Sequence, residues 1–259
     1  MPLTHAVRRL VQFPLFTSIA VLTLAIGIGA NSAIFAVVDG ILLKPLPYPE
    51  PERLVSVDHA APGVNIPRVG AAPFLYFTYR EQAKSFETIG MYQADTQSVT
   101  GLAEPEEIPV LDVTQGVLPA LGVKPALGRL FTPADDTPGR PLTVILTYAY
   151  WQARFGGDPS AIGRLVTFDG VPRQIIGVLP ASFRFLDRQA SAFVPLQLDR
   201  NKTFLGQFSF GAIARLAPGA TLDSASADMA RLIPISIKTF PAFPGYSPKM
   251  FSDARLTPA

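Results

Sequence analysis

The sequence of 259 residues has no cysteine and only 2 histidines. The absence of cysteine excludes structural disulfides, thiolate metal sites, a catalytic thiol and a lipoprotein acylation site. The histidines, His5 and His59, form no pair with metal-ligand spacing, and a catalytic triad would have to use one of them alone. We expect His59 to be a surface residue at the end of a strand rather than a catalytic base.

Phosphate-binding and nucleophile motifs are also missing. The chain has no G-x-x-x-x-G-K-[ST] loop to cradle a nucleoside triphosphate, and no G-x-S-x-G nucleophile elbow, since Phe208-Ser209-Phe210 lacks the flanking glycines. Its 22 basic and 20 acidic residues form no basic stripe of the kind that binds nucleic acid. We therefore predict that the chain is not an enzyme, needs no cofactor and has no nucleic-acid partner.

Two adjacent carboxylates, Asp135 and Asp136, follow Thr132-Pro133. The pair could serve as metal ligands or as an acid/base couple. Carboxylates at the start of a helix, however, are stabilised by the helix dipole and by solvent. We favour this structural interpretation and predict no metal site.

What the sequence does contain is a long apolar segment, within a chain that is 48% hydrophobic. No charged residue lies between Arg9 and Asp39. As a helix, residues 11–38 would extend roughly 40 Å at about 1.5 Å per residue, which exceeds the roughly 30 Å hydrocarbon core of a bilayer. The segment can therefore span a membrane.

A cleavable signal peptide is the alternative, because Arg8 and Arg9 form a basic start and Ala30-Asn31-Ser32 resembles a cleavage site. The apolar run of a signal peptide is only about 7 to 15 residues long, whereas this run continues to Val38. We therefore predict a retained transmembrane helix.

The charges on either side of the helix predict its orientation. Arg8 and Arg9 precede it, while the segment after it carries both signs, so the positive-inside rule places the amino terminus in the cytoplasm. We predict a cytoplasmic terminus over residues 1–10, a transmembrane helix and its exit over 11–43, and an extracytoplasmic domain over 44–259, in the inner (plasma) membrane.

The helix carries a file of small residues. Ala25, Gly29 and Ala33 recur at every fourth position, and Gly27 and Asn31 are placed beside them. Small residues let a second helix approach closely, and an amide inside lipid needs a hydrogen-bond partner. Small residues are also common in helices that only anchor a protein. We predict that Ala25, Gly29, Asn31 and Ala33 form a packing site for other membrane helices.

After residue 44 the pattern is that of a mixed α/β domain. Short apolar runs alternate with helical segments bounded by proline, threonine and glycine. Asp169-Gly170 between two such runs predicts a hairpin with a type I′ turn. The predicted strands are 54–57, 88–92, 108–113, 143–146, 165–168, 171–178 and 210–216, and the predicted helices are 74–82, 148–155 and 222–232. No element is predicted beyond Leu232.

Trp151 and Phe155 lie one turn apart in the predicted helix 148–155. Aromatic residues at this spacing usually form the buried face of a helix. We favour that role over the alternative that Trp151 lines a substrate pocket.

Four stretches carry a further signal: RRLVQFPLFTSIAVLTLAIGIGANSAIFAVVDGILLKPLPYPEPERLV, FLYFTYREQAKSFETIGMY, LGVKPALGRLFTPADD and VILTYAYWQARFGGDPSAIGRLVTFDGVPRQIIGVLPASFRF. The first closely resembles the initial membrane span and exit of MacB/FtsX-type ABC transporter permeases, in particular the large orphan permeases abundant in acidobacteria. The other three resemble the extracytoplasmic core domain of that family. The stretches occur in family order and cover nearly the whole chain.

The resemblance implies an α+β fold, with one amino-terminal transmembrane helix followed by a MacB-like periplasmic core. It implies the amino-terminal part of a permease subunit, as a fragment or truncated form without the family's later spans. Such a permease works as a homodimer or pseudo-dimer with a separate cytoplasmic ABC ATPase, and couples ATP hydrolysis to periplasmic conformational change for efflux or mechanotransmission. Asp39 then either marks the membrane interface, which we favour, or takes part in coupling. The alternative function is a membrane-tethered extracytoplasmic binding module that acts without transport.

Overall fold

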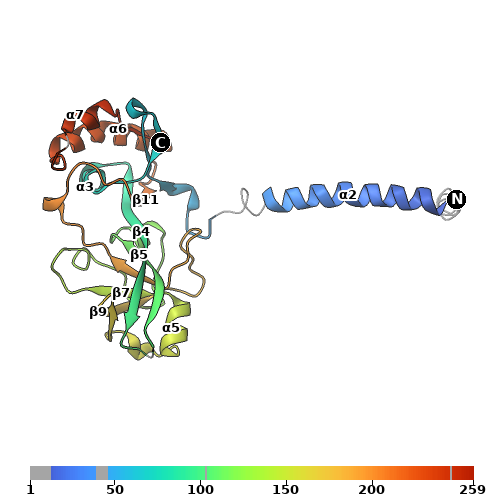
Figure 1. Ribbon diagram of the computed structural model, residues 1–259, viewed down its shortest axis with the longest axis horizontal. Helices are drawn as coiled ribbons and strands as arrows, with labels where there is room; N and C mark the ends of the chain where they lie inside the picture. Colours follow the sequence, from blue (N-terminus) through green and yellow to red (C-terminus); the bar gives the residue numbers. More distant parts are fainter. Residues whose placement is uncertain (1–12, 39–45, 103, 246) are drawn as a thin grey trace. The chain divides into compact units, whose positions relative to one another are not determined.

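The computed structural model describes residues 13–38, 46–102, 104–245 and 247–259, with the backbone alone for 36–38. The chain divides into two compact units, Met1–Pro47 and Tyr48–Ala259, and the second is called the core domain below. The first unit contains helix α2 (Pro14–Val38), of which Pro14–Phe35 is long and apolar enough to cross a membrane (Figure 1). Residues 1–10, Asp39 and the predicted exit up to residue 43 lie outside the described residues.

The core domain is built on one large sheet. Among the described residues this sheet has nine strands in the order β1-β11-β4-β5-β10-β7-β9-β6, and β8 pairs with both β4 and β9. A second sheet has the order β12-β2-β3. The strand bounds are β1 (Leu54–Ser56), β2 (His59–Ala61), β3 (Ile66–Val69), β4 (Phe86–Thr100), β5 (Glu106–Val113), β6 (Leu127–Gly128), β7 (Thr143–Leu146), β8 (Leu165–Phe168), β9 (Val171–Val178), β10 (Ala192–Pro195), β11 (Gly211–Leu216) and β12 (Thr257–Pro258).

Helices lie at both ends of the core domain, with α3, α6 and α7 at one end and α5 at the other (Figure 1). Short 3₁₀ turns η2 to η5 connect elements along the surface. The bounds are α3 (Pro73–Gln82), α4 (Val117–Ala120), α5 (Tyr148–Phe155), α6 (Leu222–Thr239), α7 (Pro248–Asp253), η2 (Pro51–Arg53), η3 (Pro62–Val64), η4 (Pro159–Ala161) and η5 (Arg200–Lys202).

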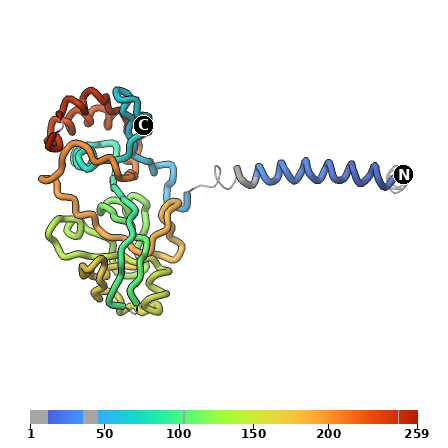
Figure 2. Tube along the Cα trace, in the orientation of Figure 1, coloured from blue at the N-terminus to red at the C-terminus, as the bar shows by residue number. Residues whose placement is uncertain are grey.

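Strand β4 joins the two ends, and its trace can be followed from one to the other in Figure 2. Its first half pairs with β11, and its second half pairs with β5 and then β8. Helix α4 packs so closely on β4 that a Cβ at Gly90 would lie 2.4 Å from the Val117 nitrogen. Only glycine fits this contact, because the backbone of α4 occupies the place of a side chain.

The predicted caps and hairpin turn are confirmed, whereas β4 is much longer than the predicted strand 88–92, and α7 and β12 lie beyond Leu232, where no element was predicted. Thr147 caps α5 by accepting a hydrogen bond from the Tyr150 nitrogen, and Gly156 ends the helix with φ 59°. In the β8–β9 hairpin, Asp169 and Gly170 have φ of 47° and 75°, the positive angles that a type I′ turn requires.

Helix α6 is longer than predicted and continues to Thr239 through Pro234. A proline inside a helix removes one backbone donor and clashes with the preceding turn. Leu232 and Ile233 are nevertheless buried in the same apolar cluster as α3, and the buried Ser236 hydroxyl donates to the Leu232 carbonyl. Burial against α3 therefore outweighs the local cost of the proline.

Candidate functional site

The four predicted helix-packing residues lie on α2, and all four are exposed in the single chain. Successive residues of an α-helix are rotated by about 100°, so Ala25, Gly29 and Ala33 share one face. By the same geometry, Gly27 and Asn31 lie on the opposite side of α2, and not beside the file as expected. The helix thus presents two separate faces, and packing at either face stays a prediction.

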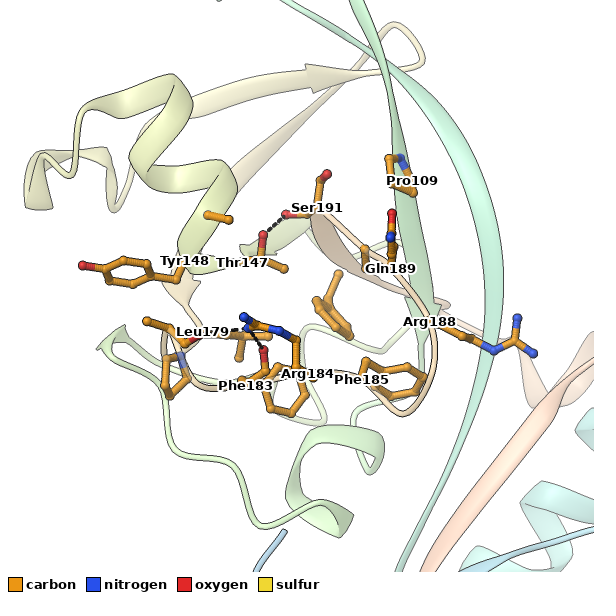
Figure 3. A pocket seen from close by; sticks show the side chains of 15 residues that line it. Pro109, Thr147, Tyr148, Leu179, Phe183, Arg184, Phe185, Arg188, Gln189 and Ser191 are labelled. Carbon is orange, nitrogen blue, oxygen red and sulfur yellow. Dashed lines mark hydrogen bonds between the residues drawn. The ribbon is translucent and has the colours of Figure 1, made fainter. Parts of the chain in front are cut away.

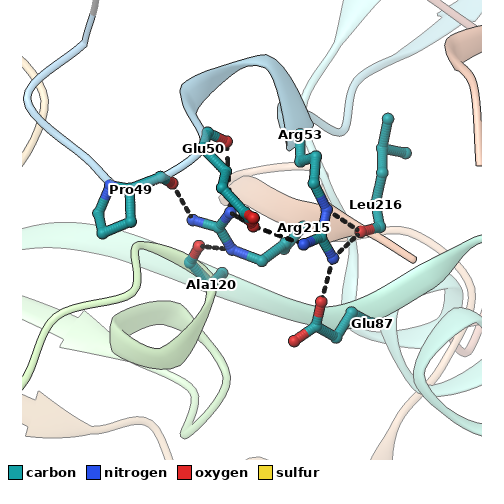
Figure 4. A network of polar contacts seen from close by, with 7 residues as sticks. All are labelled: Pro49, Glu50, Arg53, Glu87, Ala120, Arg215 and Leu216. Atoms are coloured by element: carbon teal, nitrogen blue, oxygen red, sulfur yellow. Dashed lines mark hydrogen bonds and ion pairs between the residues drawn. The ribbon is translucent and has the colours of Figure 1, made fainter. Parts of the chain in front are cut away.

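The first residues of the core domain are held by a polar network, the arginine clamp, made of Tyr48, Pro49, Glu50, Arg53 and Arg215 (Figure 4 shows all but Tyr48). Arg215 on β11 is its centre and is only 5% exposed. Its Nη2 donates to the Pro49 carbonyl (2.9 Å) and its Nη1 to the Glu50 carbonyl (3.3 Å). A buried guanidinium therefore grips the backbone that leads into the domain.

The same guanidinium reaches a third segment. Arg215 Nε donates to the carbonyl of Ala120, at the end of α4, over 2.9 Å. The Glu50 carboxylate lies 3.6 Å from Arg215 Nη1 and supplies a counter-charge. Three carbonyls and one carboxylate thus replace the water that the buried cation has lost.

Arg53 fixes the other side of the segment. Its Nε and Nη2 donate to the Leu216 carbonyl over 3.1 Å and 2.7 Å, its Nη1 lies 2.5 Å from Glu50 Oε2, and its Nη2 pairs with Glu87 on β4. Between the two arginines, Glu50 adopts a left-handed backbone with φ 47°. That conformation costs about 1 kcal/mol in a residue other than glycine, and the surrounding hydrogen bonds hold it.

Tyr48 attaches the segment to a distant loop. Its side chain is buried, its hydroxyl donates to the Arg184 carbonyl and accepts from the Leu186 nitrogen, both over 2.7 Å, and burial raises its pKa. The clamp contains no nucleophile or acid–base pair. Its arrangement suits a mechanical task, because displacement of residues 48–53 would load β11, β4 and this loop together.

His59 is not the surface residue that the sequence predicts. It is fully buried on β2, with Nε2 2.8 Å from the Tyr79 hydroxyl, and burial lowers its pKa to about 4. The prediction was wrong because β3 and β12 flank β2, and the pairing with β12 joins segments almost 200 residues apart. The imidazole is therefore neutral at pH 7, and the side chain it contacts through Nε2 is the Tyr79 hydroxyl rather than a carboxylate.

Asp135 and Asp136 lie in a turn, not at the start of a helix, and both are shielded from solvent. Asp135 accepts two hydrogen bonds from Arg129 (2.6 Å and 2.9 Å) and two from Thr132 (2.8 Å and 2.6 Å). Burial acts to raise the pKa of Asp135, but these hydrogen bonds outweigh it and lower the pKa to about 2.

Asp136 ties two further segments to this turn. It accepts from the backbone nitrogens of Gln115 and Gln197, both over 2.9 Å, while burial raises its pKa. Both carboxylates are therefore structural. Within the described part of the chain, no group of three side chains of metal-binding type comes together.

Trp151 has the core role predicted for it. Its ring is buried at 6% exposure, and its Nε1 donates to the Asp158 carbonyl over 3.0 Å. Phe155 is only partly buried and packs at the edge of the same apolar cluster.

A half-buried charged group that the sequence did not predict lies where β5 faces the β8–β9 hairpin. The charges of Arg173, Asp95 and Asp169 act on Asp112, and the Arg173 Nε and Nη1 atoms are buried without a hydrogen-bond partner among the described residues. Burial, followed by the charge of Asp95, raises the pKa of Asp112 to about 6, although Arg173 acts against it. The sequence signal was Asp112 itself, an acid at an apolar position of the strand alternation.

Comparisons with known proteins agree with this architecture. A family model described as the MacB-like periplasmic core domain matches residues 17–232. The periplasmic region of MacB from Actinobacillus actinomycetemcomitans is 13% identical with a TM-score of 0.55, over 80% of this chain and 88% of that one. The extracellular domain of the noncanonic ABC-type transporter YknZ from Gram-positive bacteria is 16% identical with a TM-score of 0.51, over 73% of this chain and 97% of that one. A sequence comparison with curated proteins gives no match. At these identities the structural likeness concerns the fold.

Replacing Arg215 tests the clamp. Arg215→Met should lower the free energy of unfolding of the core domain by about 3 kcal/mol, because three carbonyls lose their donor. The measurement is chemical unfolding of the full chain, followed by near-ultraviolet circular dichroism. Arg231→Met is the control, since Arg231 forms an exposed pair with Asp228 and should change stability by less than about 1 kcal/mol. Equal losses in both variants would contradict the assigned role of the clamp.

Replacing Asp112 tests the charged group in the hairpin region. A carboxyl pKa raised from 3.8 to about 6 in the folded state means that folding favours the protonated form. The stability contribution of Asp112 is therefore present below pH 3.8 and declines as the pH rises through about 6. Asp112→Asn should thus stabilise the chain at pH 7.5, on the order of 1 kcal/mol after allowing for solvent screening, and change little at pH 4.

Thermal unfolding at the two pH values measures this difference. The exposed Asp187→Asn variant serves as the matched control and should show no such pH-dependent gain. An Asp112→Asn variant that is less stable than the wild type at pH 7.5 would show that the ionised carboxylate supports Arg173 instead.

Proposed function

The chain belongs to the MacB-like periplasmic core domain family, and from this we propose that it is the amino-terminal part of a permease subunit that couples ATP hydrolysis to movement of its core domain. Membership implies a membrane component of an ABC transporter that works with an ATPase. In the proposal, the ATPase is a separate cytoplasmic chain, the permease acts as a homodimer or pseudo-dimer, and the work is efflux or mechanotransmission.

The arginine clamp is the observation that carries this proposal. A domain that is only tethered needs a flexible linker and gains nothing from a buried cation in its first residues. Here Arg215 and Arg53 fasten residues 49–50 to β11, to β4 and to the end of α4. Displacement of the chain at this point would be passed to the sheet, because a clamp of short hydrogen bonds yields less than a flexible linker.

The two faces of α2 support the same function. A single anchoring helix has no use for Asn31, whose amide would lack a partner in lipid. A helix with small residues on one side and an amide on the other can pack against neighbours on both sides. The further spans of a permease would supply such neighbours.

The proposal assigns no catalytic activity to the chain. Its sequence has no phosphate-binding loop, and the histidine and aspartates considered above are taken up in structural contacts. A membrane-tethered binding module remains the second candidate, favoured by a cavity in the core domain that is described below. It differs in one respect: substitutions on α2 would then leave function intact.

We propose that the amino terminus is cytoplasmic and the core domain extracytoplasmic, in the inner (plasma) membrane. Alkaline phosphatase fused after Leu54 or after Thr221 should then be active, because this reporter folds only outside the cytoplasm, and green fluorescent protein at the same sites should be dark. Fluorescent fusions at either site would contradict the orientation, and a mature protein that begins near Ala33 would contradict the retained helix.

Substitutions on α2 separate the permease from the tethered module. Gly29→Leu should insert normally but reduce co-purification with an ABC ATPase several-fold, because leucine pushes neighbouring helices apart. Ala30→Leu, a quarter turn away from both faces, makes a comparable gain in side-chain size and should have little effect. The chain is tagged in its native chromosomal context, extracted into lipid nanodiscs, and assayed for the associated ATPase chain and its ATP hydrolysis. If the Gly29→Leu complex equals the wild type, α2 only anchors and the tethered module is the better account.

A further inference from the structure

One cavity of the core domain has the form of a small-molecule site. It has a volume of about 480 Å³ and lies between the loop that follows β9, the start of α5 and Pro109 on β5 (Figure 3). This volume falls in the range of about 300 to 1,000 Å³ that is usual for ligand sites. The proposed coupling role does not involve the cavity, so the residues that line it decide which ligand it would bind.

The inner wall is aromatic. Phe193 and Phe185 are buried in the core, and Phe183 is half-buried beside them. Ring centroids lie 5.7 Å apart for Phe185–Phe193 and 6.1 Å apart for Phe183–Phe193, at interplanar angles of 69° and 59°. Phe185 and Phe193 are 3% and 1% exposed and support Phe183 from behind, so Phe183 is the ring with surface left for a ligand ring to contact. Such an aromatic contact adds to the free energy gained by burying apolar surface.

Arg184 brings a positive charge to this apolar wall. In Figure 3 its guanidinium extends among the lining side chains, where Nη1 donates to the carbonyls of Ala181 (2.9 Å) and Phe183 (2.7 Å). Those two bonds hold the group in place but do not neutralise it. No Asp or Glu belongs to the cavity lining, and Arg184 forms no ion pair within the described part of the chain.

The contrast with other arginines makes Arg184 distinctive. Arg53, Arg129, Arg154 and Arg200 each pair with a carboxylate of this chain. Arg188, on the same loop, borders the cavity, but its guanidinium points away from it and lies over the ring of Tyr92 at 5.7 Å. Of the two arginines that line the cavity, Arg184 is the one whose guanidinium lies among the lining side chains, where it is exposed, held by two carbonyls and paired with no carboxylate of the described residues. This combination favours a planar anion with two oxygens.

We propose that this cavity binds an aryl carboxylate, with the ring against Phe183, which Phe185 and Phe193 support, and the carboxylate on Arg184. The ring replaces water on the exposed part of Phe183, and the carboxylate supplies a counter-charge to the exposed guanidinium of Arg184. A neutral ring would gain only the first contribution, and a small inorganic anion only the second. Both parts are therefore required for tight binding.

The experiment compares two probes of nearly equal shape. 2-Naphthoate carries the anionic group, whereas 2-naphthamide is its uncharged counterpart. Each is titrated calorimetrically into the full chain in lipid nanodiscs, and titrations into empty nanodiscs are subtracted. The wild type should bind 2-naphthoate saturably and at least about tenfold more tightly than the amide, since a charge-assisted bidentate contact adds more than about 1.4 kcal/mol. Inorganic phosphate alone should not bind.

Three variants locate the site. Arg184→Met should weaken 2-naphthoate to the level of the amide, and Arg188→Met should leave both affinities within about twofold of the wild type. Ala149→Phe keeps both arginines but places a ring in the cavity from an exposed position of α5, and it should abolish binding of both probes. Because this change is made on the surface of a helix, it remains informative if Arg184→Met disturbs the loop.

Several results would overturn the proposal. They are the absence of saturable 2-naphthoate binding, equal affinity for acid and amide, or equal losses in Arg184→Met and Arg188→Met. Unchanged binding in Ala149→Phe would place any observed ligand elsewhere. None of these outcomes depends on an ATPase, so the site and the coupling role can fail independently.

Discussion

The buried guanidinium of Arg215 is the constraint on which the architecture of the core domain depends. A cation removed from water must be satisfied by protein groups or it unfolds its surroundings. Arg215 is satisfied by the carbonyls of Pro49, Glu50 and Ala120, which come from two segments that no strand pairing connects. The incoming chain and the end of α4 are thus bound to β11 by one side chain, and the start of the domain becomes part of its core rather than a linker.

Other polar side chains serve the same purpose in different places. Asp135 and Asp136 bind turns and loops together, Asp228 of α6 accepts from the backbone of Lys84 and Ser85 after α3, and Tyr48 holds the loop that carries Arg184. These groups hold segments that the strand ladders leave unconnected. At these positions the carboxylates contribute to the shape of the domain.

The local elements of this fold could be predicted from the sequence, because their signals lie within a few residues. Thr147 and Gly156 mark the ends of α5, and Asp169-Gly170 marks the hairpin. The long-range features could not be predicted in this way. His59 is buried because β3 (Ile66–Val69) and β12 (Thr257–Pro258) pair with β2 on either side. Helix α6 continues past Pro234 because it packs against α3. Arg215 likewise has no sequence signal of its own, because Pro49 and Ala120 come close to it only in the folded chain.

The candidate functional features divide in the same way into local signals, visible in the sequence, and long-range contacts that depend on the fold. The small-residue file of α2 is a periodic signal that could be read from sequence, and the same rotation of about 100° per residue also places Asn31 on the opposite face without a structure. The arginine clamp and the aromatic cavity have no sequence motif, since each joins elements more than 60 residues apart. The loop that follows β9 takes part in both: Tyr48 holds its backbone at Arg184, and the Arg184 side chain faces the cavity. A ligand in the cavity would therefore contact the same loop that Tyr48 binds. Ligand binding and displacement of residues 48–53 would then both act on this loop.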